Sequence, residues 1–275
     1  MSWRFFRVTY RLGMIGAMTW GLVGVAWASI AAAIFPTVAN SLPHGTLMQY
    51  YQAMPKELLA AMGLTDISLL FPNGEYSYAG YLGGEYFAFF PLLLGIYSVV
   101  YCGGLVSQEI ERGTLDMHLS QPISRVGFLF SKFSGFGALV LTATILSYTG
   151  LTVASWIGGE SINHLYLAGA HLVALLLSMA VAAYATLASC LLADPRRSLA
   201  LAGGITALTY FANIIGSAVA SLDWFQYLSL FHYYDALHLV AAGEVNWAGV
   251  GVYLGVFVAS LAAAALVFRS KDLVK

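Results

Sequence analysis

The residues best suited to bind another protein stand together in one polar stretch, SQEIERGTLDMHLSQPISR, at positions 107–125. Gly113 permits a change of direction, and Thr114 can cap a short helix. Leu115 and Leu119 then share one face of that helix at i, i+4 spacing. A short helix with an apolar face suits docking into a groove on a soluble partner. The candidate docking residues are Glu109, Glu111, Arg112, Gly113, Thr114, Leu115, Asp116, His118 and Leu119.

The sequence predicts neither a catalytic site nor a metal site. It contains no G-x-S-x-G pattern and no H-E-x-x-H pattern, and no lysine follows a glycine as in a phosphate-binding loop. His232, Asp235 and His238 recur at i, i+3 and i+6, which spreads the two histidines about 120° apart on a helix and makes a poor chelate. We therefore expect this chain to hold no metal and no cofactor.

The composition indicates a chain that is dissolved in lipid. Of 275 residues, 60% are hydrophobic and 9% are charged, whereas soluble domains carry roughly 25% charged residues. Lipid offers a bare backbone no hydrogen-bond partner, and runs of consecutive apolar residues do not fit the alternation of a barrel strand. We predict an all-α polytopic membrane protein with one transmembrane domain, 1–275. The six expected spans are residues 12–35, 86–106, 126–157, 165–193, 199–220 and 248–268.

The charges predict how the chain is oriented. Eleven of the twelve basic residues lie near the termini or around the loops after the second and fourth spans, and Lys56 is the exception. Because basic residues collect on the cytoplasmic side, we expect both termini to face the cytoplasm.

Three segments are expected outside the spans. Residues 1–11 combine arginines with aromatic residues and predict a short elbow helix in the interface. Residues 36–85 predict an outer loop with a short helix at 54–64, where Pro55 stands near the start and Gly63 near the end. Residues 221–247 are too polar to span and rich in aromatic residues, so they either lie in the interface or re-enter the outer leaflet.

Two stripes at helical spacing could line a path for a partly apolar solute. The second span carries an aromatic stripe and the fifth a polar one, and both patterns are equally typical of helix packing. Their residues are Phe87, Phe90, Leu94, Tyr97, Tyr101, and Thr206, Tyr210, Asn213, Ser217.

Several motifs together resemble a known family. The pattern E-x-E-R-G-T-L followed by P-I-S-R resembles the first cytoplasmic loop of ABC type 2 exporter permeases, the membrane subunits of ATP-binding-cassette transporters. YLSLFHYYD at 227–235 resembles the loop before their last span, although Leu230 stands where many members carry proline. FRSKDL at 268–273 is similar to their usual exit from that span.

The resemblance implies a half-transporter in a bacterial or archaeal cytoplasmic membrane. Two permeases, as a homodimer or a paralogous heterodimer, would each receive the stroke of a soluble ABC ATPase through the polar stretch. ATP and Mg would be bound by the ATPase, and this chain would not be an enzyme. The complex would export a hydrophobic or amphipathic substrate by alternating access, or use ATP in a mechanical role.

Other functions stay open at this point. A small-solute channel or a secondary transporter would need no ATPase, but ion-driven transport needs ionisable groups near mid-membrane, and the spans are nearly empty of them. Lys132 lies within two turns of the expected inner surface and is expected to snorkel outward. An intramembrane peptidase is less favoured, because Glu109 and Glu111 lack companion histidines inside the spans.

Overall fold

The computed structural model describes residues 2–41, 45–120 and 123–271, apart from the side chains of Asp116 and Leu119. Met1, Pro122 and the end of FRSKDL therefore lie outside the described residues, together with the sequence expectations that fall on them. Every element within the described part is helical. Six helical stretches are long and apolar enough to cross a membrane, which confirms the predicted fold class: Trp3–Asn40, Tyr78–Glu111, Arg125–Ile157, His164–Leu191, Pro195–Ala218 and Trp247–Ser270.

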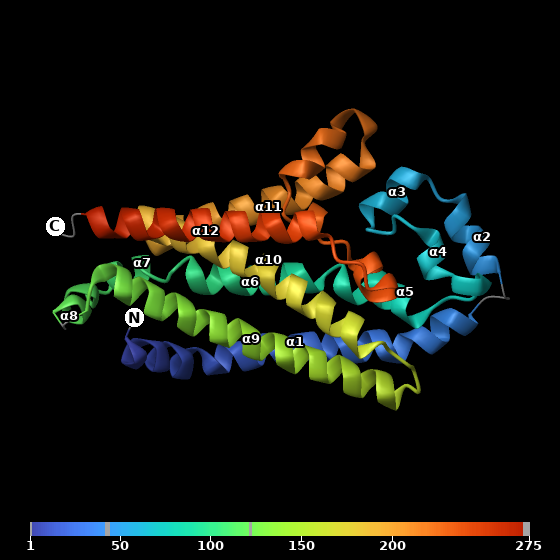
Figure 1. The fold of residues 1–275 in the computed structure, drawn as a ribbon, viewed down its shortest axis with the longest axis horizontal. Coiled ribbons are helices and arrows are strands. Elements are labelled where there is room, and N and C mark those ends of the chain that lie inside the picture. The colour runs from blue at the N-terminus through green and yellow to red at the C-terminus, as the bar shows by residue number, and fades with distance from the viewer. Residues whose placement is uncertain (1, 42–44, 121–122, 272–275) are drawn as a thin grey trace.

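These stretches form an elongated bundle (Figure 1). Five of them are the single helices α1 (Trp3–Asn40), α9 (Arg125–Ile157), α10 (His164–Leu191), α11 (Pro195–Ala218) and α12 (Trp247–Ser270). Both chain ends lie at one end of the bundle, together with the short helix α8 (Leu115–Leu119). We call this the inner end and the opposite one the outer end.

The expected separate elbow helix is wrong. Residues 3–11 are the first turns of α1, which runs as one helix to Asn40. No proline interrupts the chain before Pro36, and the small residues of α1 sit against its neighbours instead of breaking it. A Cβ on Gly13 would lie 2.2 Å from Leu139, and one on Gly24 would lie 2.2 Å from Ser147. Close packing of α1 on α9 therefore keeps the helix continuous through its glycines.

The second span is broken into pieces. It begins as α5 (Tyr78–Leu82), continues through a π-helical turn (Gly83–Phe87) into α6 (Phe90–Cys102), and ends as α7 (Ser107–Glu111) after a short turn. Pro91 stands in the first turn of α6, where its missing N–H costs no helical bond. The 13 residues of α6 are thus bounded by an irregular segment at each end.

The outer loop forms a cap of short helices, α2 (Thr46–Ala53), α3 (Lys56–Ala61) and α4 (Ile67–Leu70), and a turn at Pro72–Gly74. The helix expected at 54–64 is α3, which follows Pro55, while Gly63 adopts a φ of +75°. The cap has its own apolar cluster, formed by Leu59, Leu64, Leu70, Phe71 and Leu237.

The segment before the last span folds back on the bundle. Its first turns (Ala220–Leu228) return along the end of α11, where Ser217 donates a 3.2 Å hydrogen bond to Gln226. This hairpin projects sideways from the bundle (Figure 1). Two further turns, Phe231–Tyr233 and His238–Ala242, then place Phe231 and Leu239 in buried positions of the main core. The segment therefore does not span, and it contributes to the core.

Candidate functional site

The polar stretch folds into two short helices with a sharp corner between them. Gly113 takes a φ of +67°, a conformation that favours glycine, and so turns the chain from α7 into α8. The backbone N–H of Thr114 donates to the carbonyl of Glu109 (3.0 Å), and the carbonyl of Thr114 accepts from His118 (3.1 Å). The predicted change of direction and second helix are both present.

Glu109 is the centre of a polar network at the inner end. One carboxylate oxygen accepts a 2.6 Å hydrogen bond from Nζ of Lys132 on α9. The other accepts from the hydroxyl of Thr114 and lies 3.4 Å from Nε2 of His118. Glu109 therefore ties both arms of the corner to the bundle.

The expectation that Lys132 snorkels outward is wrong. Its ammonium group is largely buried and donates to the Glu109 carboxylate and to the carbonyl of Leu105 (3.1 Å). Leu105 lies in the turn after α6, where the carbonyl groups lack a continuous helical ladder. The ammonium group of Lys132 can stay inside the protein because the Glu109 carboxylate and the Leu105 carbonyl both accept hydrogen bonds from it.

Aromatic contacts fasten α8 to a third element. The ring of His118 stacks on Phe128 of α9, with ring centroids 5.7 Å apart, and meets the edge of Phe5 at 5.4 Å. Phe5 also contacts Phe128 at 5.2 Å. Because Phe5 belongs to α1, a displacement of α8 acts on both α1 and α9.

The expected docking face of α8 requires a correction. The Leu115 side chain is only 3% exposed and belongs to the core of the bundle. An apolar side chain next to an apolar bundle is buried there instead of being left in water. The accessible side of the corner carries Glu111, Arg112 and Gly113, together with Met117, which is 61% exposed.

The aromatic stripe of the second span lies inside the bundle. Phe87, Phe90, Leu94 and Tyr97 are buried, and Tyr101 is half-buried. In the described structure these rings make core contacts, for example between Tyr97 and the rings of Trp20 (5.7 Å) and Phe136 (5.3 Å). A role in a substrate path stays a prediction for them.

A cavity of about 320 Å³ lies between α6 and α11. Thr206 and Tyr210 of the predicted polar stripe line it, whereas Asn213 and Ser217 are half-buried further along α11. The Thr206 hydroxyl is already paired with the Tyr184 hydroxyl at 2.5 Å. The wall is therefore largely apolar, and it is formed by Leu92, Ile96, Val99, Gly203, Thr206, Ala207, Tyr210 and Phe211.

Sequence reasoning missed the α6 wall of this cavity and the partners of Lys132. The signal for the wall is the 4 and 3 residue spacing of Leu92, Ile96 and Val99, which places them on a face other than the aromatic stripe. The signal for the pair is the lysine itself, since a charge within a span usually has a partner.

Two comparisons with known proteins find similar sequences. Residues 19–273 match the model of a family described as ABC-2 family transporter protein. An uncharacterized protein of Bacillus subtilis (strain 168), YhcI, is 28% identical over 211 residues, which are 67% of this chain and 66% of the relative. The match thus spans just under two thirds of that relative's length.

Proposed function

Because the chain belongs to the ABC-2 transporter family, whose members are multi-pass membrane permeases that work with an ABC ATPase, we propose that it is the permease subunit of an ATP-driven exporter. Separate ATPase chains would bind ATP and Mg and hydrolyse the nucleotide. The observation that carries the proposal is the corner of α7 and α8, which is fastened to α1 and α9 while one side of it stays accessible.

The accessible side of the corner would be the contact for the ATPase. Glu111, Arg112 and Gly113 offer polar groups, and Met117 is an exposed apolar side chain that adapts to a partner's groove. Force applied there would reach α9 through the pair of Glu109 and Lys132. The docking side is thus opposite to the buried Leu115.

Two permeases, either identical or paralogous, would pair in the membrane with two ATPases. The substrate would be hydrophobic or amphipathic, and it would move by alternating access along the cavity between α6 and α11. Support for this path comes from the apolar wall of the cavity, which suits the apolar part of such a substrate. Both termini and the corner would face the cytoplasm of a bacterial or archaeal cell, since the arginines gather at the inner end.

Copurification with a single matched pair of variants tests the proposal. Met117→Asp places a charge in the docking contact and should lower the amount of copurified ABC ATPase at least about tenfold, since an unpaired buried charge costs several kcal/mol. Met62→Asp makes the same substitution at another exposed methionine, which lies in the outer cap and is 45% exposed. This control variant should leave the ATPase bound. The tagged chain is purified from its native host, and the ATPase is identified by mass spectrometry and by ATP hydrolysis in the eluate. Equal retention by both variants would contradict docking on the corner, and absence of any ABC ATPase from the unmodified preparation would contradict the proposed function.

A further inference from the structure

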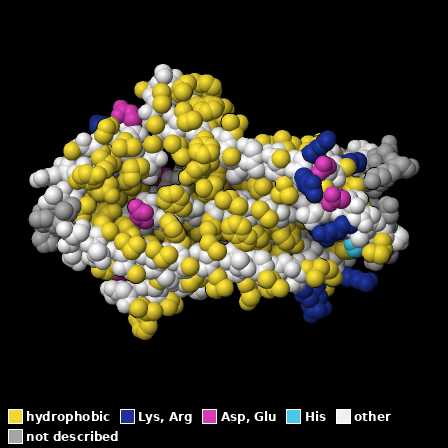
Figure 2. Space-filling view, turned by 180° about the vertical axis from the view of Figure 1, so that it is seen from behind, with side chains coloured by type: hydrophobic (Ala, Val, Ile, Leu, Met, Phe, Trp, Pro, Cys, Tyr) yellow, Lys and Arg dark blue, Asp and Glu magenta, His cyan; other side chains and the backbone are white. Residues whose placement is uncertain are grey.

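Three arginines form an unpaired basic strip on α1 at the inner end. Arg4, Arg7 and Arg11 are spaced by three and four residues, so they lie on one side of the helix, and all three are exposed. None of them takes part in an ion pair with another described residue; Arg7 lies 5.6 Å over the ring of Trp3. Figure 2 shows basic side chains projecting from this end of the molecule.

The start of the strip is unfavourable for the helix itself. The amino-terminal end of a helix carries a partial positive charge, so the cation of Arg4, which stands in the first turn, is repelled. The first turn of α1 contains no acidic residue that would offset this repulsion. An external anion would supply the missing negative charge.

The exposed side of α1 becomes mainly apolar after the strip, within which Val8 is 46% exposed. Leu12 and Ile15 are 80% and 79% exposed, and such apolar exposure continues toward the outer end. Because apolar side chains on a membrane helix face hydrocarbon, the edge of the hydrocarbon lies near Arg11. The three guanidinium groups are therefore at the level of the lipid headgroups.

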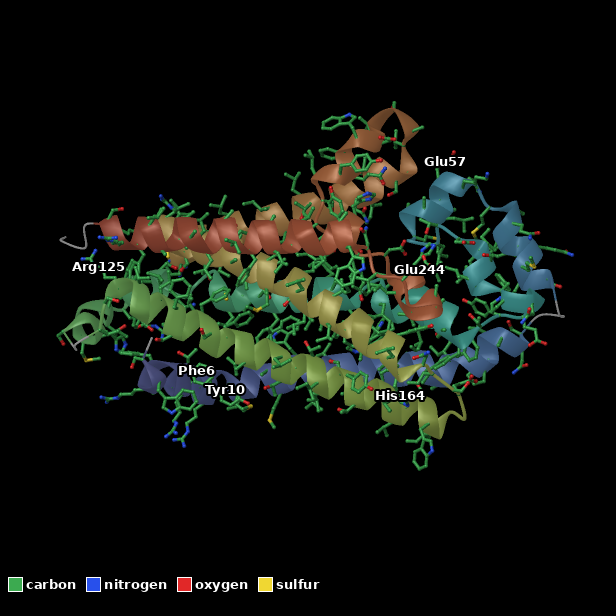
Figure 3. All side chains as sticks on the ribbon, in the orientation of Figure 1. Phe6, Tyr10, Glu57, Arg125, His164 and Glu244 are labelled. Atoms are coloured by element: carbon green, nitrogen blue, oxygen red, sulfur yellow. The ribbon has the colours of Figure 1, made fainter. Side chains whose placement is uncertain are left out.

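A stack of aromatic rings runs beside the arginines. Trp3 and Phe6 are stacked with centroids 4.9 Å apart, and Phe6 and Tyr10 lie parallel at 6.3 Å. The Tyr10 hydroxyl lies 3.2 Å from Thr142 Oγ1 on α9, which anchors the stack. Figure 3 shows Phe6 and Tyr10 next to one another at the amino-terminal end of α1. Tryptophan and tyrosine are typical of the membrane interface, so these rings would hold this part of α1, and with it the strip, at the interface.

We propose that Arg4, Arg7 and Arg11 bind the phosphate of an anionic phospholipid headgroup, while the acyl chains of the lipid lie over Leu12 and Ile15. Guanidinium groups suit this ligand because they donate paired hydrogen bonds to phosphate oxygens. A glycerol headgroup adds no cation that would compete with the arginines, so phosphatidylglycerol fits better than phosphatidylcholine. The site is independent of the proposed transport function, since it needs no ATPase.

Native mass spectrometry of the full chain in detergent tests the site. The probes are dioleoylphosphatidylglycerol, dioleoylphosphatidylcholine and inorganic phosphate. We expect the phosphatidylglycerol to bind about tenfold tighter than the phosphatidylcholine, and the triple variant Arg4→Gln, Arg7→Gln, Arg11→Gln to lose that preference. If the triple variant fails to fold, the single variant Arg11→Gln takes its place, because it keeps two of the three cations that orient the chain. Arg11→Gln should weaken phosphatidylglycerol binding about fivefold.

A matched control removes the same charge from the same end of the bundle. Arg196→Gln, Arg197→Gln, Arg269→Gln deletes three exposed arginines outside the strip and should keep the phosphatidylglycerol preference. An equal loss in both triple variants would mean a general charge effect and would overturn the site. The site is also overturned if inorganic phosphate competes as well as the lipid, or if neither variant changes the affinity.

Discussion

The two ends of the bundle are held together by different kinds of contact. At the inner end, cations meet acceptors: Lys132 binds Glu109 and Leu105, and Lys271 donates to the carbonyl of Cys190 at 2.7 Å. At the outer end, the cap is closed by apolar and aromatic packing, such as Phe71 on Tyr76 at 5.1 Å. Hydrogen-bonded charges fix distance and direction, whereas apolar contact is non-directional. The inner end is thus suited to transmit a displacement, and the outer end is suited to seal.

The largest expected effect on stability is at the apolar contact between the cap and the bundle. Leu237 is fully buried between the cap and the bundle, so Leu237→Ala should lower the free energy of unfolding by about 2–5 kcal/mol. Thermal unfolding of the purified chain in detergent measures the loss. Leu228→Ala, at an exposed position of the same outer segment, is the control and should be nearly neutral. A similar loss in both variants would contradict a seal made by packing.

The next effect is at the inner network. Lys132→Met leaves the Glu109 carboxylate without its cation and should cost about 2–4 kcal/mol, somewhat less than in a fully buried pair because the two side chains are 16% and 19% exposed. The free thiols of Cys102 and Cys190, both buried near the inner end, should then react faster with a maleimide dye. Adding Glu109→Gln removes the stranded charge and should restore part of the protection. If the double variant is as reactive as the single one, the pair does not hold the inner end.

Leu237→Ala sharpens this contrast when it is assayed with the same dye. Below its unfolding temperature it should leave the labelling rates of Cys102 and Cys190 close to those of the unmodified chain, because it loosens the opposite end. Equal acceleration by Lys132→Met and Leu237→Ala would mean that the two ends open as one unit.

The smallest expected effect concerns a polar contact at the outer end. Asp66 caps α4 by accepting from the backbone N–H (2.8 Å) and the hydroxyl (2.7 Å) of Ser68. These hydrogen bonds hold the pKa of the Asp66 carboxyl below its ordinary value. A carboxyl whose pKa is lower in the folded than in the unfolded state stabilises the fold at pH values above its unfolded-state pKa, near 3.9. This stabilisation is lost as the pH falls through the folded-state pKa. Asp66→Ala should therefore cost about 0.5–1 kcal/mol at pH 7 and less below about pH 4, measured by unfolding at both pH values. A cost that does not change with pH would contradict a charged cap.

Local properties could be predicted from the sequence, and contacts between distant segments could not. The six spans follow from runs of apolar residues, and α3 follows from Pro55 and Gly63. The burial of Leu115 depends on where the corner lies against the bundle, which its i, i+4 spacing does not encode. The direction of Lys132 depends likewise on Glu109, 23 residues earlier in the chain.

The elbow illustrates the same limit in another way. Arginine and aromatic residues at 1–11 have the composition of an interfacial helix, and composition contains no information on whether the helix bends before Leu12. The glycines of α1 fit against Leu139 and Ser147, so packing on α9 decides that it continues.

The two interruptions around α6 have a mechanical consequence. Since a Cβ at Gly21 would lie 3.3 Å from the Cα of Ala143, α1 and α9 are in near-backbone contact and would move as one unit. The α6 helix is instead bounded by irregular backbone at both ends, the π-helical turn Gly83–Phe87 and the turn after Cys102, where a change of backbone angles would be absorbed. A force applied at the corner of α7 and α8 would tilt α6 relative to α1 and α9. The cavity between α6 and α11 would then change its width, while α6 keeps its own backbone hydrogen bonds.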